Sequence, residues 1–342
     1  NREIIRCLRS ISKYNILNED YENIIKFLKL NDQKLDSILG KNKLQILLLK
    51  HIEHIGCGNL ISRIRYKSYS NWLFHLQYQY SEYLDIIYEL SQSFAEKNIR
   101  YAILKGMANN AELFVENSIL YRPFADLDIL IDVAQIDKVG DILKEHSFVQ
   151  GYFKNNQIVK ATRKELIYWR LNSHQLHEYV KFSKYSNISS LYRLAIDVNF
   201  TIFEGGKCND PINNSNILDH VMDRFIAPNS IIKCLDYTYG LLQLCYHFYK
   251  DTVYEVKKNT HDNYCLKKFC DIREYVIKFY NHINWNEFIV TVNGAKIGNQ
   301  IYHTLLLVST FYGDLNIDEI LQQINVTERL CTENIDWEAM LL

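Results

Sequence analysis

The stretch that decides the fold is Arg122-Pro-Phe-Ala-Asp126-Leu-Asp128-Ile-Leu-Ile-Asp132. Successive side chains of a β-strand point to opposite faces of the sheet. A strand over 125–133 would therefore have an apolar face made of Leu127, Ile129, Ile131 and Val133. Asp126 and Asp128 would share the other face, with Cα atoms roughly 6.6 Å apart. Two carboxylates at that spacing can bind one hard cation between them, and they would repel each other without it.

A third carboxylate occurs in Leu194-Ala-Ile-Asp197-Val-Asn199-Phe200, within a strand expected over 191–203. The same alternation places Asp197 and Asn199 opposite the apolar residues. If this strand lies beside the first, Asp197 completes a triad with Asp126 and Asp128. Three carboxylates can hold two metal ions roughly 3.5–4 Å apart. We therefore expect Mg²⁺ as cofactor, with Mn²⁺ as the alternative ion, and we interpret Asp132 as a solvated or capping residue.

A possible phosphate cradle lies at Leu104-Lys105-Gly106-Met107. A strand is expected over 101–104 and a helix over 107–116. Gly106 would permit close backbone approach, and the free N–H groups at a helix start favour anions. Lys105 and Arg122 could add positive charge against a triphosphate. Two other interpretations stay open: Arg122 pairs with one of the carboxylates, or Lys105 is a solvated flanking lysine.

Together these motifs resemble the nucleotidyltransferase superfamily of the DNA polymerase β fold, and more closely the bacterial family of uncharacterised nucleotidyltransferases. That family shows Leu-Lys-Gly at a strand end, then Arg-x-x-x-Asp-x-Asp, then a later Asp in a strand. The resemblance covers about residues 40–300. This chain differs where the superfamily often has Gly-Ser, here Lys105-Gly106, and where the family often has His after the third carboxylate, here Val198-Asn199.

The resemblance implies an enzyme that moves a nucleoside monophosphate from an NTP to a hydroxyl of an acceptor and releases pyrophosphate. The acceptor could be a small molecule, a peptide or an RNA. A second hypothesis is a nucleotide-binding sensor or scaffold of the same fold without turnover. A third is a toxin-like or antibiotic-modifying transferase, acting on tRNA, a protein or an aminoglycoside.

The composition of the chain limits the classes of protein to which it can belong. The 342 residues carry a net charge of -1, so no overall field attracts nucleic acid or a membrane. No apolar run approaches the roughly 20 residues needed to cross a bilayer, and eight cysteines without a CxxC pair indicate reduced thiols in a cytoplasmic protein. Nothing in the sequence indicates an oligomeric state.

Periodicity predicts an α+β protein with a small mixed β-sheet packed against helices. We expect three segments: a helical N-terminal region (1–97), a nucleotidyltransferase core (98–215) and a helical C-terminal domain (216–342).

Four further residues have simpler interpretations. His174 and His177 would point to opposite faces of a strand, which argues against shared zinc ligation. His247 and Asp271 lie on two expected C-terminal helices and are expected to form a structural pair.

Overall fold

The computed structural model describes residues 1–116, 119–188, 192–203, 212, 214–227, 230–254, 264–327 and 335–342. The chain forms two compact units. Unit 1 comprises Asn1–Phe74, Tyr121–Pro123 and Leu244–Leu342, and unit 2 comprises His75–Leu120 and Phe124–Gln243. Two helices, α5 (Arg63–Glu96) and α10 (Tyr237–Tyr249), contribute residues to both units.

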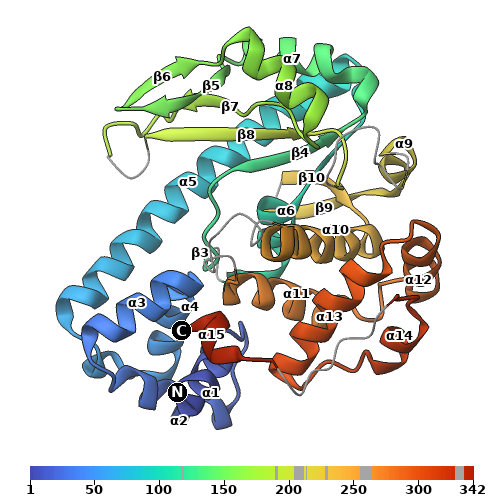
Figure 1. Ribbon diagram of the computed structural model, residues 1–342. Coiled ribbons are helices and arrows are strands. Elements are labelled where there is room, and N and C mark those ends of the chain that lie inside the picture. Colours follow the sequence, from blue (N-terminus) through green and yellow to red (C-terminus); the bar gives the residue numbers. More distant parts are fainter. Residues whose placement is uncertain are drawn as a thin grey trace. The chain divides into compact units, whose positions relative to one another are not determined.

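Unit 1 is built from helices at both ends of the chain (Figure 1). Those from the N-terminal part are α1 (Arg2–Ile11), α2 (Asn18–Leu28), α3 (Asp32–Asn42), α4 (Gln45–Ile55) and the short η1 (Gly58–Leu60). Those from the C-terminal part are η5 (Lys250–Tyr254), α11 (Leu266–Phe279), α12 (Trp285–Gly294), α13 (Gly298–Tyr312), α14 (Asp318–Gln323) and α15 (Trp337–Leu341).

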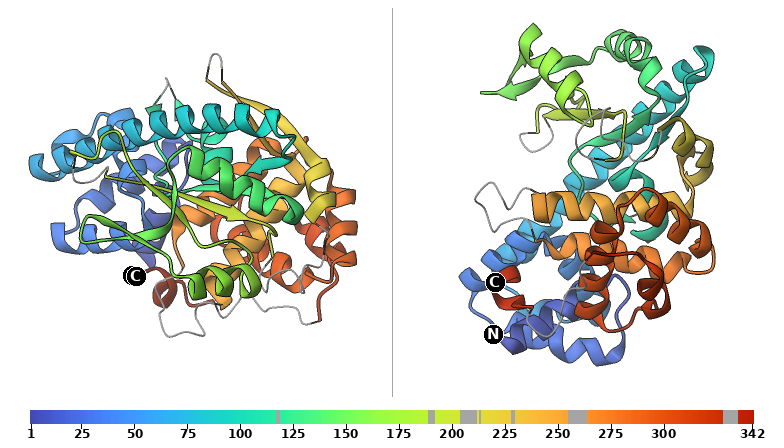
Figure 2. Two further views of the ribbon diagram at one scale, coloured as in Figure 1. Left: turned by 90° about the horizontal axis from the view of Figure 1, so that it is seen from above. Right: turned by 45° about the vertical axis from the view of Figure 1, so that its right-hand side comes forward.

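Hydrogen bonds between buried groups join these two sets of helices. The Tyr312 hydroxyl lies 2.9 Å from Ser12 Oγ, and Asn42 Nδ2 donates to the Leu341 carbonyl at 3.0 Å. The chain termini also lie close together, because Asn1 Nδ2 donates to Glu338 at 2.7 Å (Figures 1 and 2). The N-terminal and C-terminal helices thus share one core.

His51 is a buried polar residue in that core. Its side chain is fully buried on α4, with Nε2 3.1 Å from the Ile11 carbonyl. Burial, together with the charge of Lys50, lowers the pKa of His51 to about 3. His51 therefore stays neutral in the folded state at pH values where an unfolded histidine, with a pKa of about 6.5, is charged.

This difference predicts a pH-dependent stability. Below about pH 6.5 the unfolded chain binds a proton that the folded chain does not, so stability falls by up to about 1.4 kcal/mol per pH unit until about pH 3. His51→Gln keeps an N–H donor for the Ile11 carbonyl but does not titrate. Urea unfolding at about pH 7.5 and about pH 5 should show a smaller loss for the variant than for the wild type. Equal losses in both proteins would contradict this account.

Unit 2 is organised around a mixed eight-stranded sheet in the order β6-β5-β7-β8-β4-β1-β10-β9 (Figure 1). The strands are β1 (Tyr101–Ile103), β4 (Leu127–Ile131), β5 (Val149–Lys154), β6 (Gln157–Lys160), β7 (Tyr179–Phe182), β8 (Arg193–Asn199), β9 (Val221–Ala227) and β10 (Ser230–Leu235). The pairs β4–β8 and β1–β10 are parallel and the other pairs are antiparallel. A separate hairpin joins β2 (Val115–Glu116) to β3 (Ile119–Leu120).

The helices of unit 2 are the second part of α5, α6 (Lys105–Leu113), α7 (Ile136–Glu145), α8 (Arg163–Asn172), α9 (Asn214–Ile217), the first part of α10 and the short η2 (Val133–Gln135) and η4 (Leu218–His220). The α+β class with a mixed sheet, predicted from the sequence, is confirmed.

One face of the sheet is apolar and covered by helices. Leu127 and Ile196 are register partners on β4 and β8, and both are fully buried. Phe94 of α5 packs edge-on against Tyr101 on this face, with ring centroids 4.8 Å apart. The strand alternation predicted for 125–133 is confirmed as far as Ile131; Val133 instead begins η2 and is 36% exposed.

Tyr83 of α5 links strand β8 to the segment that precedes β4. Its fully buried hydroxyl accepts a hydrogen bond from the Ala195 N–H at 2.9 Å. The same hydroxyl lies 3.1 Å from the Ala195 carbonyl and 3.3 Å from the Ala125 carbonyl. One side chain therefore ties together the backbone two residues before Asp197 and the backbone next to Asp126.

Two secondary-structure predictions were wrong. The helical pattern expected from 216 onward is interrupted by the β9–β10 hairpin, whose alternate residues such as Arg224 and Phe225 are buried and exposed in turn. The strand expected to contain His174 and His177 begins only after them, at β7, and is preceded by one isolated bridge between Gln175 and Asn199.

Two further observations concern the chain as a whole. Within the described residues, no helix is both long and apolar enough to cross a membrane. Six cysteines lie in the described part of the chain, and all six are buried and free of disulfides. Cys208 and Cys331 lie outside the described residues.

Candidate functional site

Two of the predicted carboxylates are register partners at the centre of the unit 2 sheet. Asp128 on β4 pairs with Asp197 on the parallel strand β8. Register partners on neighbouring strands lie about 4.8 Å apart and point to the same face. Asp126 precedes β4 by one residue, two positions before Asp128. The expectation that the Asp197 strand lies beside the Asp128 strand is confirmed.

The sheet face that carries Asp126, Asp128 and Asp197 has an excess of negative charge. Burial, followed by the negative charges of Asp128 and Asp126, raises the pKa of the Asp197 carboxyl well above its ordinary value. Asp128 is only 3% exposed, so water does little to separate the two charges. Such an arrangement favours the approach of a cation, because a positive charge would relieve both desolvation and repulsion.

Lys105 supplies a positive charge to this face from within the protein. Its ammonium group donates to Asp128 Oδ1 at 2.7 Å. Burial disfavours this ammonium group, but Asp128, Asp126 and Asp197 outweigh the effect and raise the pKa of Lys105. Lys105 is thus a charged counter-ion of Asp128, and the alternative of a solvated flanking lysine is wrong.

The turn that presents Lys105 has an unusual backbone. Lys105 has φ 44, a left-handed conformation that costs a non-glycine residue about 1 kcal/mol or more. It begins α6, whose first turn has no side-chain cap. The preceding Leu104 N–H donates to the Asp128 carbonyl at 2.9 Å, which holds this turn against β4. Helix N–H groups without intrahelical partners, as at Gly106 and Met107, are suited to bind an anion.

A metal ion was predicted at the carboxylates. Across the described residues, no three His, Cys, Asp or Glu side chains stand together so that they could hold one. The donor chemistry nevertheless suits a hard divalent cation, because oxygen ligands come from neighbouring strands and repel one another in its absence. The predicted metal triad of Asp126, Asp128 and Asp197 therefore stays a proposal.

Arg122 belongs to unit 1, although it is only four residues from Asp126. Its Nε donates to Asp271 Oδ1 at 2.6 Å, its Nη2 donates to Asp271 Oδ2, and its Nη1 lies 3.3 Å from the Pro123 carbonyl. Both carboxylate and guanidinium are about nine-tenths buried. Arg122 is therefore paired with Asp271 on α11.

Comparison with known families matches residues 29–313 to the family described as uncharacterised nucleotidyltransferase. The chain belongs to this family. Among solved structures, an antigenic nucleotidyltransferase-like protein from Paracoccidioides brasiliensis is similar, with 14% identity and a TM-score of 0.41 over 71% of this chain and 93% of that one. A comparison with curated proteins gives no match. Family membership supports a transferase activity in general.

In this nucleotidyltransferase family member, the polar face has two further residues that were not predicted as site residues. Asn199 donates to Asp128 Oδ1 at 3.3 Å and to the Asp197 carbonyl at 3.2 Å. Glu178 adds a negative charge that contributes to the raised pKa of Asp197. Strand alternation predicts that Asn199 lies on this face but does not predict its contacts. Glu178 comes close to Asp197 only through the antiparallel pairing of β7 with β8, which no motif in the sequence indicates.

The histidines lie elsewhere. His177 packs edge-on against Trp169 of α8, with ring centroids 5.9 Å apart, and shares no metal cluster with His174 among the described residues. The prediction that His247 pairs with Asp271 was wrong. His247 Nε2 instead lies 3.1 Å from Asp251, one helical turn further along the chain. Asp271 is instead the partner of Arg122.

Proposed function

We infer that the chain is a metal-dependent nucleotidyltransferase that moves a nucleoside monophosphate from an NTP to a hydroxyl of an acceptor. The observation that carries the proposal is the in-register pair Asp128–Asp197 beside Lys105 at the start of α6. This arrangement occurs in a chain that belongs to a nucleotidyltransferase family. The acceptor could be a small molecule, a peptide or an RNA.

Asp126, Asp128 and Asp197 are the residues that would hold Mg²⁺, or Mn²⁺ as the alternative ion. When bound, the metal supplies Lewis-acid stabilisation of the negative charge on the phosphates. In the proposed reaction, the acceptor hydroxyl loses its proton to Asp197 and its oxygen bonds to the α-phosphorus. The bond from this phosphorus to the bridging oxygen breaks, and pyrophosphate leaves.

The start of α6 is the proposed phosphate contact. The backbone N–H groups at Gly106 and Met107 would donate to phosphate oxygens. Lys105 would balance negative charge between Asp128 and the phosphates. Arg122 is assigned a structural role instead, because its Nε and Nη2 both donate to the Asp271 carboxylate.

The experiment that tests this proposal does not require the acceptor to be identified first. The full chain is incubated with each α-labelled NTP, Mg²⁺ and a fractionated cell extract, and both pyrophosphate release and the transfer of label are measured. We expect one fraction to become labelled with equal release of pyrophosphate, and we expect a chelator to abolish both. Tight NTP binding in calorimetry without pyrophosphate release from any fraction would overturn the proposal and favour the nucleotide sensor.

A further inference from the structure

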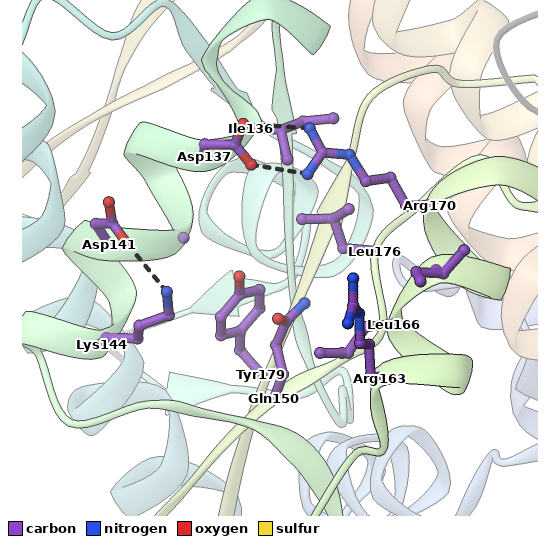
Figure 3. Close-up of a pocket in the computed structure, with 12 residues that line it drawn as sticks. Ile136, Asp137, Asp141, Lys144, Gln150, Arg163, Leu166, Arg170, Leu176 and Tyr179 are labelled. Carbon is purple, nitrogen blue, oxygen red and sulfur yellow. Dashed lines mark hydrogen bonds and ion pairs between the residues drawn. The ribbon is translucent and has the colours of Figure 1, made fainter.

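We propose that a hollow between α7 and α8 in unit 2 binds a compact molecule that carries one phosphate or carboxylate group. The hollow has a volume of about 230 Å³, with walls from the two helices and a floor from β5 and β7 (Figure 3). This site is independent of the proposed nucleotidyl transfer and stands on its own observations.

The hollow lies on the face of the sheet opposite the carboxylates. Its floor residue Tyr179 is the register partner of Ile196, which in turn is the partner of Leu127. These three side chains share the apolar face. Asp128 and Asp197 occupy the neighbouring positions along their strands and point the other way. A ligand in the hollow is therefore separated from the proposed phosphate contacts by the sheet.

The floor of the hollow presents the hydroxyl of a tyrosine whose side chain is otherwise buried. Tyr179 is only 2% exposed, and no described residue forms a hydrogen bond with its hydroxyl, which points into the hollow (Figure 3). Burial is the largest of the effects that raise the pKa of Tyr179 to about 12, so the hydroxyl stays a donor. This hydroxyl is therefore available to donate to an acceptor group bound in the hollow.

Glycine at position 140 keeps that hydroxyl within reach of a ligand. A Cβ atom at Gly140 would lie 2.9 Å from the Tyr179 hydroxyl, too close for an ordinary contact. Any other residue at this place on α7 would meet the hydroxyl oxygen and force it to shift.

The charges around the hollow sum to an excess of one cation. Arg170 donates to Asp137 at 2.8 Å, and Lys144 donates to Asp141 at 2.9 Å (Figure 3). Both acids are therefore already neutralised. Arg163, on the same face of α8 as Arg170, has no ion pair with any residue that the structure describes. The surplus of one positive charge, together with the Tyr179 donor, favours a single anionic group.

Size and wall chemistry narrow the ligand further. The remaining walls include the apolar side chains of Ile136, Leu166 and Leu176. Pockets for drug-sized ligands are usually about 300–1,000 Å³, so the hollow is small for a nucleoside triphosphate. A phosphate or carboxylate on a small apolar body matches both the volume and the walls.

The test uses phenyl phosphate and benzoate as probes for the two anionic groups, with benzyl alcohol as a neutral analogue. Binding to the full chain is measured by calorimetry and ligand-observed NMR for the wild type and three variants. Arg163→Gln removes the surplus charge, and Tyr179→Phe removes only the hydroxyl. Lys164→Gln is the matched control, because it removes a charge from the adjacent exposed residue, which does not line the hollow.

We expect one of the two anions to bind saturably and benzyl alcohol to bind far more weakly. Arg163→Gln should weaken binding about tenfold and Tyr179→Phe about fivefold, whereas Lys164→Gln should change it less than about twofold. Addition of ATP with Mg²⁺ should leave the affinity unchanged. Equal losses for Arg163→Gln and Lys164→Gln, displacement by ATP, or no saturable binding of either anion would each overturn the proposal.

Discussion

Replacing Asp128 by asparagine is expected to lower the rate of pyrophosphate release by about 10³-fold while leaving unit 2 folded. The amide has nearly the same shape as the carboxylate, and its oxygen can still accept hydrogen bonds from Lys105 and Asn199. What the variant loses is one negative charge beside Asp197. Calorimetry with NTP and Mg²⁺ should show a matching loss of metal-dependent nucleotide binding.

The matched control is Asp132→Asn. Asp132 follows β4 on the same strand face, and its Oδ1 accepts from the Ala134 N–H at 2.9 Å at the start of η2. Asparagine is an equally good cap, so we expect activity within about twofold of the wild type. Retained pyrophosphate release and retained Mg²⁺-dependent NTP binding in Asp128→Asn would place the proposed site elsewhere.

The central strands could be predicted because their sequences alternate strongly. Apolar and acidic residues alternate through Leu127 and Asp128, and again through Ile196 and Asp197. A strand buried on one side has only one register that keeps its apolar residues in the core. The neighbouring positions of Asp128 and Asp197 then follow once the two strands pair in parallel.

The contacts around the carboxylates could not be predicted in the same way. The Lys105–Asp128 ion pair and the hydrogen bonds of Tyr83 join residues 23 and 112 positions apart. Such contacts depend on how the elements pack, which local periodicity does not encode. The β9–β10 hairpin was missed for a related reason, since short apolar runs suit a helix or a strand equally well.

The motif Arg-x-x-x-Asp-x-Asp is shared between the two units of the chain. The chain enters unit 1 for only three residues, Tyr121–Pro123, and then returns to unit 2 before Asp126. Proximity in sequence favoured a shared role for Arg122 and the carboxylates. The structure instead gives the arginine a partner 149 positions away, which no sequence spacing indicates.

Asp271→Ala is expected to destabilise unit 1 by about 3–5 kcal/mol, the usual result of removing one partner from a buried ion pair. The Arg122 side chain is 10% exposed, so its guanidinium group would lose its main counter-ion without gaining water. Lys267 adds to the loss of stability, because it is a second positive charge close to Arg122. Its ammonium group donates to the Pro123 carbonyl at 2.9 Å. Burial, and then the charge of Arg122, already lower the pKa of Lys267 to about 7.

The control for this variant is Asp36→Ala, which breaks an ion pair of similar geometry in the same unit. Arg65 donates to both Asp36 oxygens at 2.8 Å, but Asp36 is 55% exposed and Arg65 keeps Asp32 as a second partner. We expect Asp36→Ala to lower the free energy of unfolding, measured in urea, by about 1 kcal/mol or less.

The double variant Arg122→Met/Asp271→Leu should recover most of the stability that Asp271→Ala loses, because apolar residues can replace a buried ion pair. If Asp271→Ala costs no more than Asp36→Ala, the pair does not anchor segment 121–123 to α11, and Arg122 becomes available for the phosphate role first suggested by its sequence motif.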